Sequence, residues 1–172
     1  LGPGRREWGA RFPYLTIRDQ VSAAAAFADA LGVARFAAVI GGSMGGMHAL
    51  EWAIRFPERT ERLAVIAAPP VTTADQIGLN LVQLEAIRSD PAYRDGDYYD
   101  TPDGVGPHHG LATARRMALL NYRSFTELNE RFGRAWQSAV SPLGSGGRFA
   151  VESYLDFHGN KFTRRFDAGS YL

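Results

Sequence analysis

The sequence predicts an α/β fold, with parallel strands and covering helices in its first part and a helical region after it. Two observations predict this. Residues 16–70 alternate helix-period segments with short apolar runs, in the order helix, strand, helix, strand. After Pro70, the pattern contains helices and loops but no convincing strand. We therefore expect a partial α/β core over residues 1–70 and a helical lid, inserted over the sheet, over residues 71–172.

The first helix is predicted after a loop rich in glycine, proline and arginine, which covers residues 1–14. Thr16 and Asp19 have the spacing of a capping box, in which each residue satisfies a backbone N–H at the start of a helix. Apolar residues then recur at helical spacing between Val21 and Leu31, and Gly32 is placed to end the helix.

Two apolar runs have the length and composition of buried parallel strands. They cover residues 35–40 and 63–68. Between them, residues 41–46 form a tight glycine-rich turn, and Met47 to Phe56 continue at helical spacing. In the second part of the chain, helical patterns cover residues 73–87, 109–120, 124–132 and 149–158.

Composition excludes several functional classes. The 172 residues carry a formal net charge of +1, and their arginines are scattered, so neither nucleic acid nor a membrane surface is expected as a partner. The chain has no cysteine, which removes disulfides, thiolate metal sites and a cysteine nucleophile, and which fits a reducing cytoplasm. Its apolar stretches are too short to span a bilayer. We expect no metal site and no bound cofactor.

The motif that carries chemistry is G-x-S-x-G, formed by residues 41–45 between a predicted strand and a predicted helix. A nucleophile on such a sharp turn has strained backbone angles, so its neighbours must be small. Ser43 is therefore predicted to be a catalytic nucleophile. The backbone N–H of Met44 would lie at the N-terminus of the following helix, where it favours developing negative charge and forms half of an oxyanion hole.

Glycine-rich turns between a strand and a helix also bind phosphates, which is the main alternative for this motif. Here the glycines lack a usable G-x-G-x-x-G spacing, and the only lysine of the chain is Lys161, far from the turn. A serine nucleophile also needs a base, usually a histidine that a carboxylate orients. None of the four histidines follows a predicted strand end, so we predict packing, surface or helix-start roles for them: His48, His108, His109 and His158.

Several stretches resemble the homoserine O-acetyltransferase family, and together they cover nearly the whole chain. The longest is Gly41-Gly42-Ser43-Met44-Gly45-Gly46-Met47-His48-Ala49-Leu50-Glu51-Trp52-Ala53. The others include Arg11-Phe12-Pro13, Thr16-Ile17-Arg18-Asp19-Gln20-Val21, Gly96-Asp97-Tyr98-Tyr99, Ala114-Arg115-Arg116-Met117-Ala118, Tyr122-Arg123-Ser124, Asn129-Glu130-Arg131-Phe132 and Arg165-Phe166-Asp167-Ala168-Gly169-Ser170-Tyr171-Leu172. Where this chain has His48, His158 and Gly169, family members more often carry Gln, Gln and Asn.

The resemblance implies an α/β-hydrolase core with a helical lid, and homodimers that form through the lid helices. It implies a ping-pong reaction in methionine biosynthesis: the serine takes an acetyl group from acetyl-CoA, the co-substrate, and passes it to the hydroxyl of L-homoserine. By position, Ser43 resembles the nucleophile, and Arg115 resembles the residue that holds the carboxylate of the amino acid. Tyr122 lies about two helical turns beyond Arg115 and would assist from the same face. Without the resemblance, a solvated helix charge is the favoured interpretation of Arg115.

The family's catalytic Asp and His fall outside the stretches that this chain matches. The resemblance therefore implies a middle piece of the enzyme, inactive by itself, and two strands alone predict low stability. Three alternatives stay open: a serine esterase of the same fold, a homoserine O-succinyltransferase, and a non-enzymatic dimerisation module in which the turn is a relic.

Overall fold

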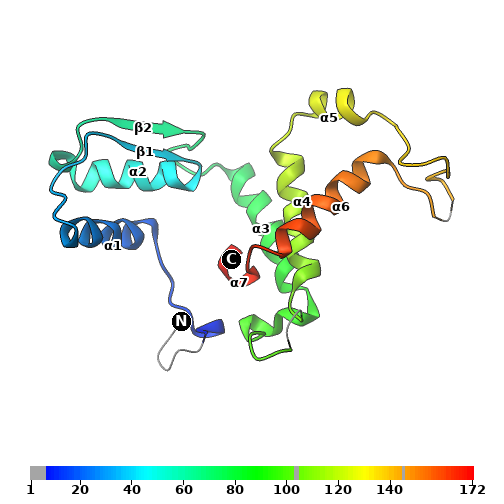
Figure 1. Cartoon of the computed structure of the whole chain (residues 1–172), viewed down its shortest axis with the longest axis horizontal. Helices are drawn as coiled ribbons and strands as arrows, with labels where there is room; N and C mark the ends of the chain where they lie inside the picture. The colour runs from blue at the N-terminus through cyan, green and yellow to red at the C-terminus, as the bar shows by residue number, and fades with distance from the viewer. Residues whose placement is uncertain (1–6, 103–104, 145) are drawn as a thin grey trace. The chain divides into compact units, whose positions relative to one another are not determined.

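The computed structural model describes residues 7–102, 105–144 and 146–172 (Figure 1). These residues form two compact units. One comprises residues 13–74, and the other comprises residues 7–12 together with the described residues from Asp75 onward. The division of the chain at residue 70 stays a prediction. The structure places its boundary four residues later, and it groups residues 7–12 with the helical unit.

The first unit is a two-stranded parallel sheet with two helices, shown in blue, cyan and blue-green in Figure 1. Strand β1 (Val39–Gly42) pairs with β2 (Leu63–Ile66) so that Val39 lies opposite Leu63 and Gly42 opposite Ile66. Helix α2 (Met44–Arg55) packs against both strands, and α1 (Ile17–Ala30) packs against α2. A 3₁₀ turn, η3 (Pro57–Arg59), follows α2. The predicted alternation of helix and strand is confirmed.

The ends of α1 follow the predicted sequence signals. The Thr16 hydroxyl accepts a hydrogen bond from the Asp19 N–H, and the Asp19 carboxylate accepts one from the Thr16 N–H at 2.8 Å. Gly32 follows the helix with a φ of 71°, a conformation that glycine adopts at little cost. The inner face of α1 packs on Trp52 in a core that is completed by aromatic and aliphatic residues: Val21, Ala25, Ala28, Phe36, Val39 and Phe56.

The bounds and the burial of the strands differ from the prediction. Strand β1 begins at Val39 and not at residue 35, with an isolated bridge between Phe36 and Thr60 before it. Strand β1 continues through Gly41 and Gly42, which were expected in the turn, because both glycines pair with β2. Strand β2 ends at Ile66 because Ala67 has a φ of 50° and leaves the extended conformation. The expected burial on both faces is wrong for one face. Ile40 is 68% exposed and Ile66 is 59% exposed, since α1 and α2 cover one side only.

The second unit is helical, as predicted, and a single isolated bridge, between Trp136 and Phe149, is the only strand-like pairing among its described residues. Its elements are η2 (Gly9–Arg11), α3 (Ala74–Arg88), η4 (Pro91–Gly96), α4 (His108–Asn121), α5 (Phe125–Phe132), α6 (Ala150–Thr163) and α7 (Ala168–Tyr171). Helix α4 packs along α6, and α7 packs on α4 (Figure 1). None of the helices in the described ranges is long and apolar enough to cross a membrane.

The core of the helical unit lies where α3, α4, α6 and α7 meet. Its buried members are Ile87, Tyr98, Leu111, Ala114, Phe162 and Ala168. Helix α6 continues to Thr163, five residues past the predicted end at His158, because Phe162 belongs to this core. Helix α7 was not predicted, since four residues are too few to show helical periodicity.

Candidate active site

Ser43 connects the end of β1 to the start of α2, so the predicted turn between strand and helix is present. Its φ and ψ are 55° and −126°, which is unusual for a residue with a side chain. Such a conformation costs on the order of 1–3 kcal/mol and persists only where the surrounding structure holds it. The strain predicted from the motif is therefore observed at the serine itself.

Backbone hydrogen bonds hold Ser43 in this conformation from two sides. Its N–H donates to the carbonyl oxygen of Ile66 at 2.9 Å, which ties the turn to the neighbouring strand. Its carbonyl oxygen accepts from the N–H of Gly46 at 2.8 Å, within the first turn of α2. The side chain is exposed and does not cap the helix that follows. The turn therefore presents the Ser43 hydroxyl outward, without a hydrogen-bond partner among the described residues.

Close packing at the turn explains two of its glycines. A Cβ atom on Gly41 would overlap the carbonyl oxygen of Gly45, and one on Gly46 would lie 2.5 Å from the Cβ of Ala68. Gly45 is different, because a Cβ there meets nothing within 4 Å beyond its own helix among the described residues. Sterically, this turn thus requires Gly41 and Gly46, and the latter lies just outside the G-x-S-x-G motif.

This difference predicts unequal effects of single alanine substitutions on stability. We expect Gly46→Ala to lower the free energy of unfolding by about 1–3 kcal/mol, because the added methyl group forces α2 away from Ala68. The matched control Gly45→Ala should be neutral or stabilise the helix by up to about 1 kcal/mol. Urea unfolding of the two variants measures both values. If both variants lost the same free energy of unfolding, steric crowding around the added methyl group would not decide where this turn needs glycine.

The N–H of Met44 is the predicted oxyanion donor. Met44 is the first residue of α2, and the N–H groups of a first turn have no partner within their own helix. No acceptor for this N–H is present among the described residues. The positive end of the helix dipole lies at the same place, so the position suits an oxygen that gains negative charge.

No base for Ser43 is found in the described part of the chain. His48 is half-buried on α2, and its Nε2 is buried without a hydrogen-bond partner. His108 and His109 begin α4, as predicted. His158 packs against the Tyr154 ring at a centroid distance of 4.6 Å, which confirms its predicted packing role.

Arg115 and Tyr122 lie together, as their spacing on one helix predicts. Arg115 is on α4, and Tyr122 is the C-cap of the same helix and is 65% exposed. The guanidinium carbon of Arg115 lies 5.6 Å from the centroid of the Tyr122 ring and 4.8 Å from that of Phe162. Two aromatic rings thus orient the guanidinium group of Arg115 through cation–π contacts.

The charge of Arg115 is not neutralised within the described residues. No carboxylate pairs with it, and no acceptor hydrogen-bonds its guanidinium group there. The next residue, Arg116, behaves differently, because its guanidinium lies 3.1 Å from the Asp156 carboxylate. An oriented and unpaired guanidinium is suited to bind the carboxylate of a small molecule.

The helical unit contains a polar network that was not predicted from the sequence. The hydroxyls of Tyr98 and Tyr99 donate to the two oxygens of the Asp167 carboxylate, at 2.6 and 2.8 Å. The Gly169 N–H donates to the Tyr98 oxygen at 2.7 Å, and the Ser170 N–H donates to Asp167 at 2.9 Å. Residues almost 70 positions apart make these bonds, and neither composition nor periodicity predicts such a pairing.

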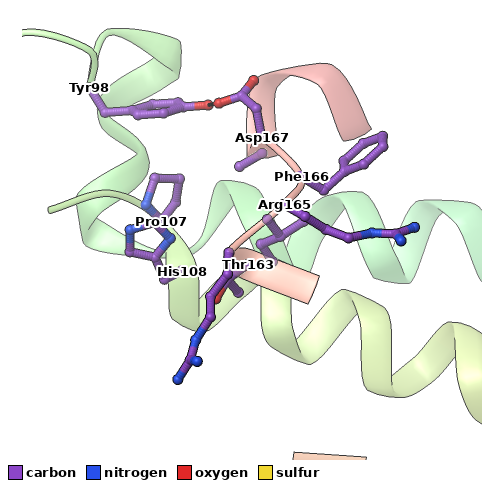
Figure 2. Close-up of a pocket in the computed structure, with 10 residues that line it drawn as sticks. Tyr98, Pro107, His108, Thr163, Arg165, Phe166 and Asp167 are labelled. Carbon is purple, nitrogen blue, oxygen red and sulfur yellow. Dashed lines mark hydrogen bonds between the residues drawn. The ribbon is translucent and has the colours of Figure 1, made fainter. Parts of the chain in front are cut away.

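The network closes one side of a pocket of about 370 Å³, in which the Tyr98 hydroxyl points at Asp167 (Figure 2). The remaining lining comes from the start of α4 and the segment between α6 and α7. These residues are Pro107, His108, Leu111, Thr163, Arg164, Arg165, Phe166 and Ala168. None of the predicted site residues lines the pocket, and the network joins residues 167–170 to Tyr98 and Tyr99 in the segment that follows η4.

The network makes a prediction about acid. Burial opposes ionisation of Asp167, but hydrogen bonds from Tyr98, Tyr99 and Ser170 outweigh it and hold the pKa of this carboxyl below its ordinary value. Burial, and then the bond to Asp167, raises the pKa of Tyr98. Because the pKa of Asp167 is lower in the folded state, its contribution is full above the unfolded value of about 3.9 and is lost as the pH falls through the folded value.

We therefore expect Asp167→Asn to lower the free energy of unfolding by about 1–3 kcal/mol at pH 7. Below about pH 4 the deficit should shrink, because the unsubstituted carboxyl becomes protonated as well. Urea unfolding of both proteins between pH 7 and pH 3 measures it, with the exposed Asp100→Asn as a control. A deficit that stays constant over this range would refute the role assigned to the ionised carboxylate.

Comparisons with known proteins identify the fold. Residues 2–170 match the family model of the alpha/beta hydrolase fold. The chain is 74% identical over all its 172 residues to a homoserine O-acetyltransferase of Leifsonia xyli subsp. xyli, of which it covers 43%. It aligns with the crystal structure of homoserine O-acetyltransferase from Bacillus anthracis at 25% identity and a TM-score of 0.83, covering 98% of this chain and 44% of that one. Esterase E22 aligns at 26% identity and a TM-score of 0.83, covering 97% of this chain and 45% of that one.

The chain belongs to the α/β-hydrolase fold family. Within that family, the resemblance to the homoserine O-acetyltransferases is confirmed along the whole chain. The chain spans less than half the length of the curated relatives it matches.

Proposed function

We propose that the protein containing this chain transfers an acetyl group from acetyl-CoA to the hydroxyl of L-homoserine, through an acetyl ester on Ser43. The observation that carries the proposal is the 74% identity to a homoserine O-acetyltransferase, which extends over both the Ser43 turn and the Arg115 region. The strained turn supports a nucleophile, and the oriented guanidinium supports an amino-acid acceptor.

In the first half-reaction, the Ser43 oxygen attacks the thioester carbonyl of acetyl-CoA while a base takes its proton. The carbonyl oxygen becomes an oxyanion, to which the Met44 N–H donates. When the intermediate collapses, the carbon–sulfur bond breaks, the base gives its proton to the leaving thiolate of CoA, and the acetyl group stays on Ser43. We place the base in the part of the protein that the longer relatives have in addition.

In the second half-reaction, the hydroxyl of homoserine attacks the acetyl-serine and gives its proton to the same base. The oxyanion forms again beside Met44, and its collapse returns the proton to Ser43 and releases O-acetylhomoserine. Arg115 holds the carboxylate of homoserine during this step with two parallel hydrogen bonds, and Tyr122 borders the same site. The bound homoserine thereby occupies the position from which water would otherwise attack the acetyl-serine.

A hydrolase is the second candidate, and the similarity to esterase E22 favours it. In this case water replaces homoserine and the product is acetate. The experiment incubates the full-length protein with acetyl-CoA, with and without homoserine, and separately with a simple acetyl ester. Formation of O-acetylhomoserine supports the transferase, whereas ester hydrolysis without any transfer would establish the esterase instead. Succinyl-CoA in the same assay determines which acyl donor is used.

We further propose that two copies associate through the lid helices. Helix α5 has no buried residue, its Phe125 is 78% exposed, and Leu120 at the end of α4 is 47% exposed. Apolar side chains of this size gain from burial in an interface. Sedimentation of the full-length protein and of Phe125→Asp tests the assignment, and an unchanged mass of the variant would place the interface elsewhere.

A further inference from the structure

One face of the helical unit combines aromatic rings with basic side chains. We call it the α5–α6 basic face, and it consists of Arg131, Tyr154, Phe157, His158 and Lys161. The residues are connected by ring contacts. The guanidinium carbon of Arg131 lies 5.0 Å from the Tyr154 ring centroid, and Tyr154 lies 4.6 Å from His158. His158 lies 5.2 Å from Phe157, over which the Lys161 amine lies at 5.8 Å. The face is therefore continuous from α5 to α6.

Both cations of this face lack an acidic partner among the described residues. Three of the four carboxylates of α5 and α6 are engaged elsewhere: Glu127 with Arg123, Glu152 with the Phe149 N–H, and Asp156 with Arg116 and Arg148. The fourth, Glu130, is exposed on α5. A net positive charge thus remains over the face.

The environment of His158 agrees with this excess of positive charge. Burial, followed by the charges of Lys161, Arg115, Arg131 and Arg123, lowers the pKa of the His158 imidazole. The ring is therefore neutral near pH 7 and adds aromatic surface rather than charge. Phe157 beside it is 62% exposed, which is a large apolar area left in water.

We propose that the α5–α6 basic face binds the adenosine phosphate part of the acyl-CoA co-substrate, an inference that rests on the function proposed above. Phosphate oxygens contact Arg131 and Lys161, and the adenine ring lies against Phe157. Unpaired cations favour phosphate because no internal ion pair has to be broken, and an exposed ring gains by stacking on a base. The low net charge of the chain, +1, favours a single nucleotide over a nucleic acid as the ligand of this face.

The test compares two acetyl donors in the full-length protein: acetyl-CoA and S-acetylpantetheine, which has the same thioester but no nucleotide. Lys161→Gln and Arg131→Gln should each raise KM for acetyl-CoA about tenfold and leave KM for S-acetylpantetheine unchanged. Arg88→Gln on α3, whose charge pairs with Glu85, is the matched control and should change neither value. Calorimetric titration with free coenzyme A should show the same losses of affinity.

The outcomes separate this inference from the proposed function. Unchanged affinity for coenzyme A in both variants overturns the site, even if acetyl transfer proceeds from both donors. If coenzyme A binds to the unsubstituted protein and the substitutions lower its affinity, the site is supported. This holds even if neither donor supports acetyl transfer, a result that would overturn the proposed transferase function instead. Weakened dimerisation with unchanged affinity for coenzyme A would show that a second copy of the protein covers this face, and would overturn the proposal.

Discussion

Replacing Ser43 by alanine is expected to reduce acetyl transfer by the full-length protein about 10⁴-fold or more, because no other atom at the turn can carry the acetyl group. The strained backbone stays in place, since its φ of 55° is held by two backbone hydrogen bonds, from the Ser43 N–H to the Ile66 carbonyl oxygen and from the Gly46 N–H to the Ser43 carbonyl oxygen. The measurement is the rate of O-acetylhomoserine formation from acetyl-CoA and homoserine.

Two controls separate loss of chemistry from loss of fold. The thermal melting temperature of Ser43→Ala should equal that of the unsubstituted protein, and so should its affinity for coenzyme A. Suppose that Ser43→Ala keeps the melting temperature, the affinity for coenzyme A and the full transferase activity of the unsubstituted protein. Ser43 would then not be the nucleophile, and the turn would be a structural relic.

Replacing Arg115 by glutamine is expected to lower kcat/KM for homoserine about a hundredfold or more, mainly through KM. The guanidinium group is held over Phe162 and Tyr122 and has no internal carboxylate among the described residues, so its charge is available to the substrate. Arg115→Lys should recover only part of the loss, since an ammonium group cannot make two parallel hydrogen bonds. Steady-state kinetics with homoserine varied at saturating acetyl-CoA measure these values.

Arg116 provides the matched control for Arg115. It is the next residue along α4, but it pairs with Asp156, and so we expect Arg116→Gln to lower the melting temperature and leave KM for homoserine unchanged. If both variants showed the same pattern, with lower stability and unaltered KM, then Arg115 would be one more structural charge of the lid. Hydrolysis of acetyl-serine by water should persist in Arg115→Gln, because it needs no bound carboxylate.

The first unit follows local sequence signals closely. The capping pair Thr16 and Asp19 and the end of α1 before Gly32 are decided by neighbours within a few residues, and the serine turn is marked by its own glycines; the structure has each of them. The burial of Ile40 and Ile66 was mispredicted because an apolar run shows only that a residue is apolar. Whether such a residue is buried depends on which other segments of the chain pack against it.

The candidate site divides in the same way. Ser43 and the Met44 N–H were predictable because their chemistry depends on one short turn, while the spacing of Arg115 and Tyr122 placed them on one helix face. That Arg115 is unpaired and Arg116 paired was not predictable, because it depends on Asp156, which lies 40 residues away on α6. The bonds from Tyr98 and Tyr99 to Asp167 depend on an even longer separation.

The acetyl-enzyme is the most direct test of the central claim that Ser43 carries the acetyl group between two substrates. The full-length protein is incubated with acetyl-CoA in the absence of homoserine, digested, and analysed by mass spectrometry. We predict one added acetyl group on the peptide containing Ser43, which disappears when homoserine is added and O-acetylhomoserine is formed. Transfer of the acetyl group without any label on Ser43, or with the label on another residue, would contradict the account.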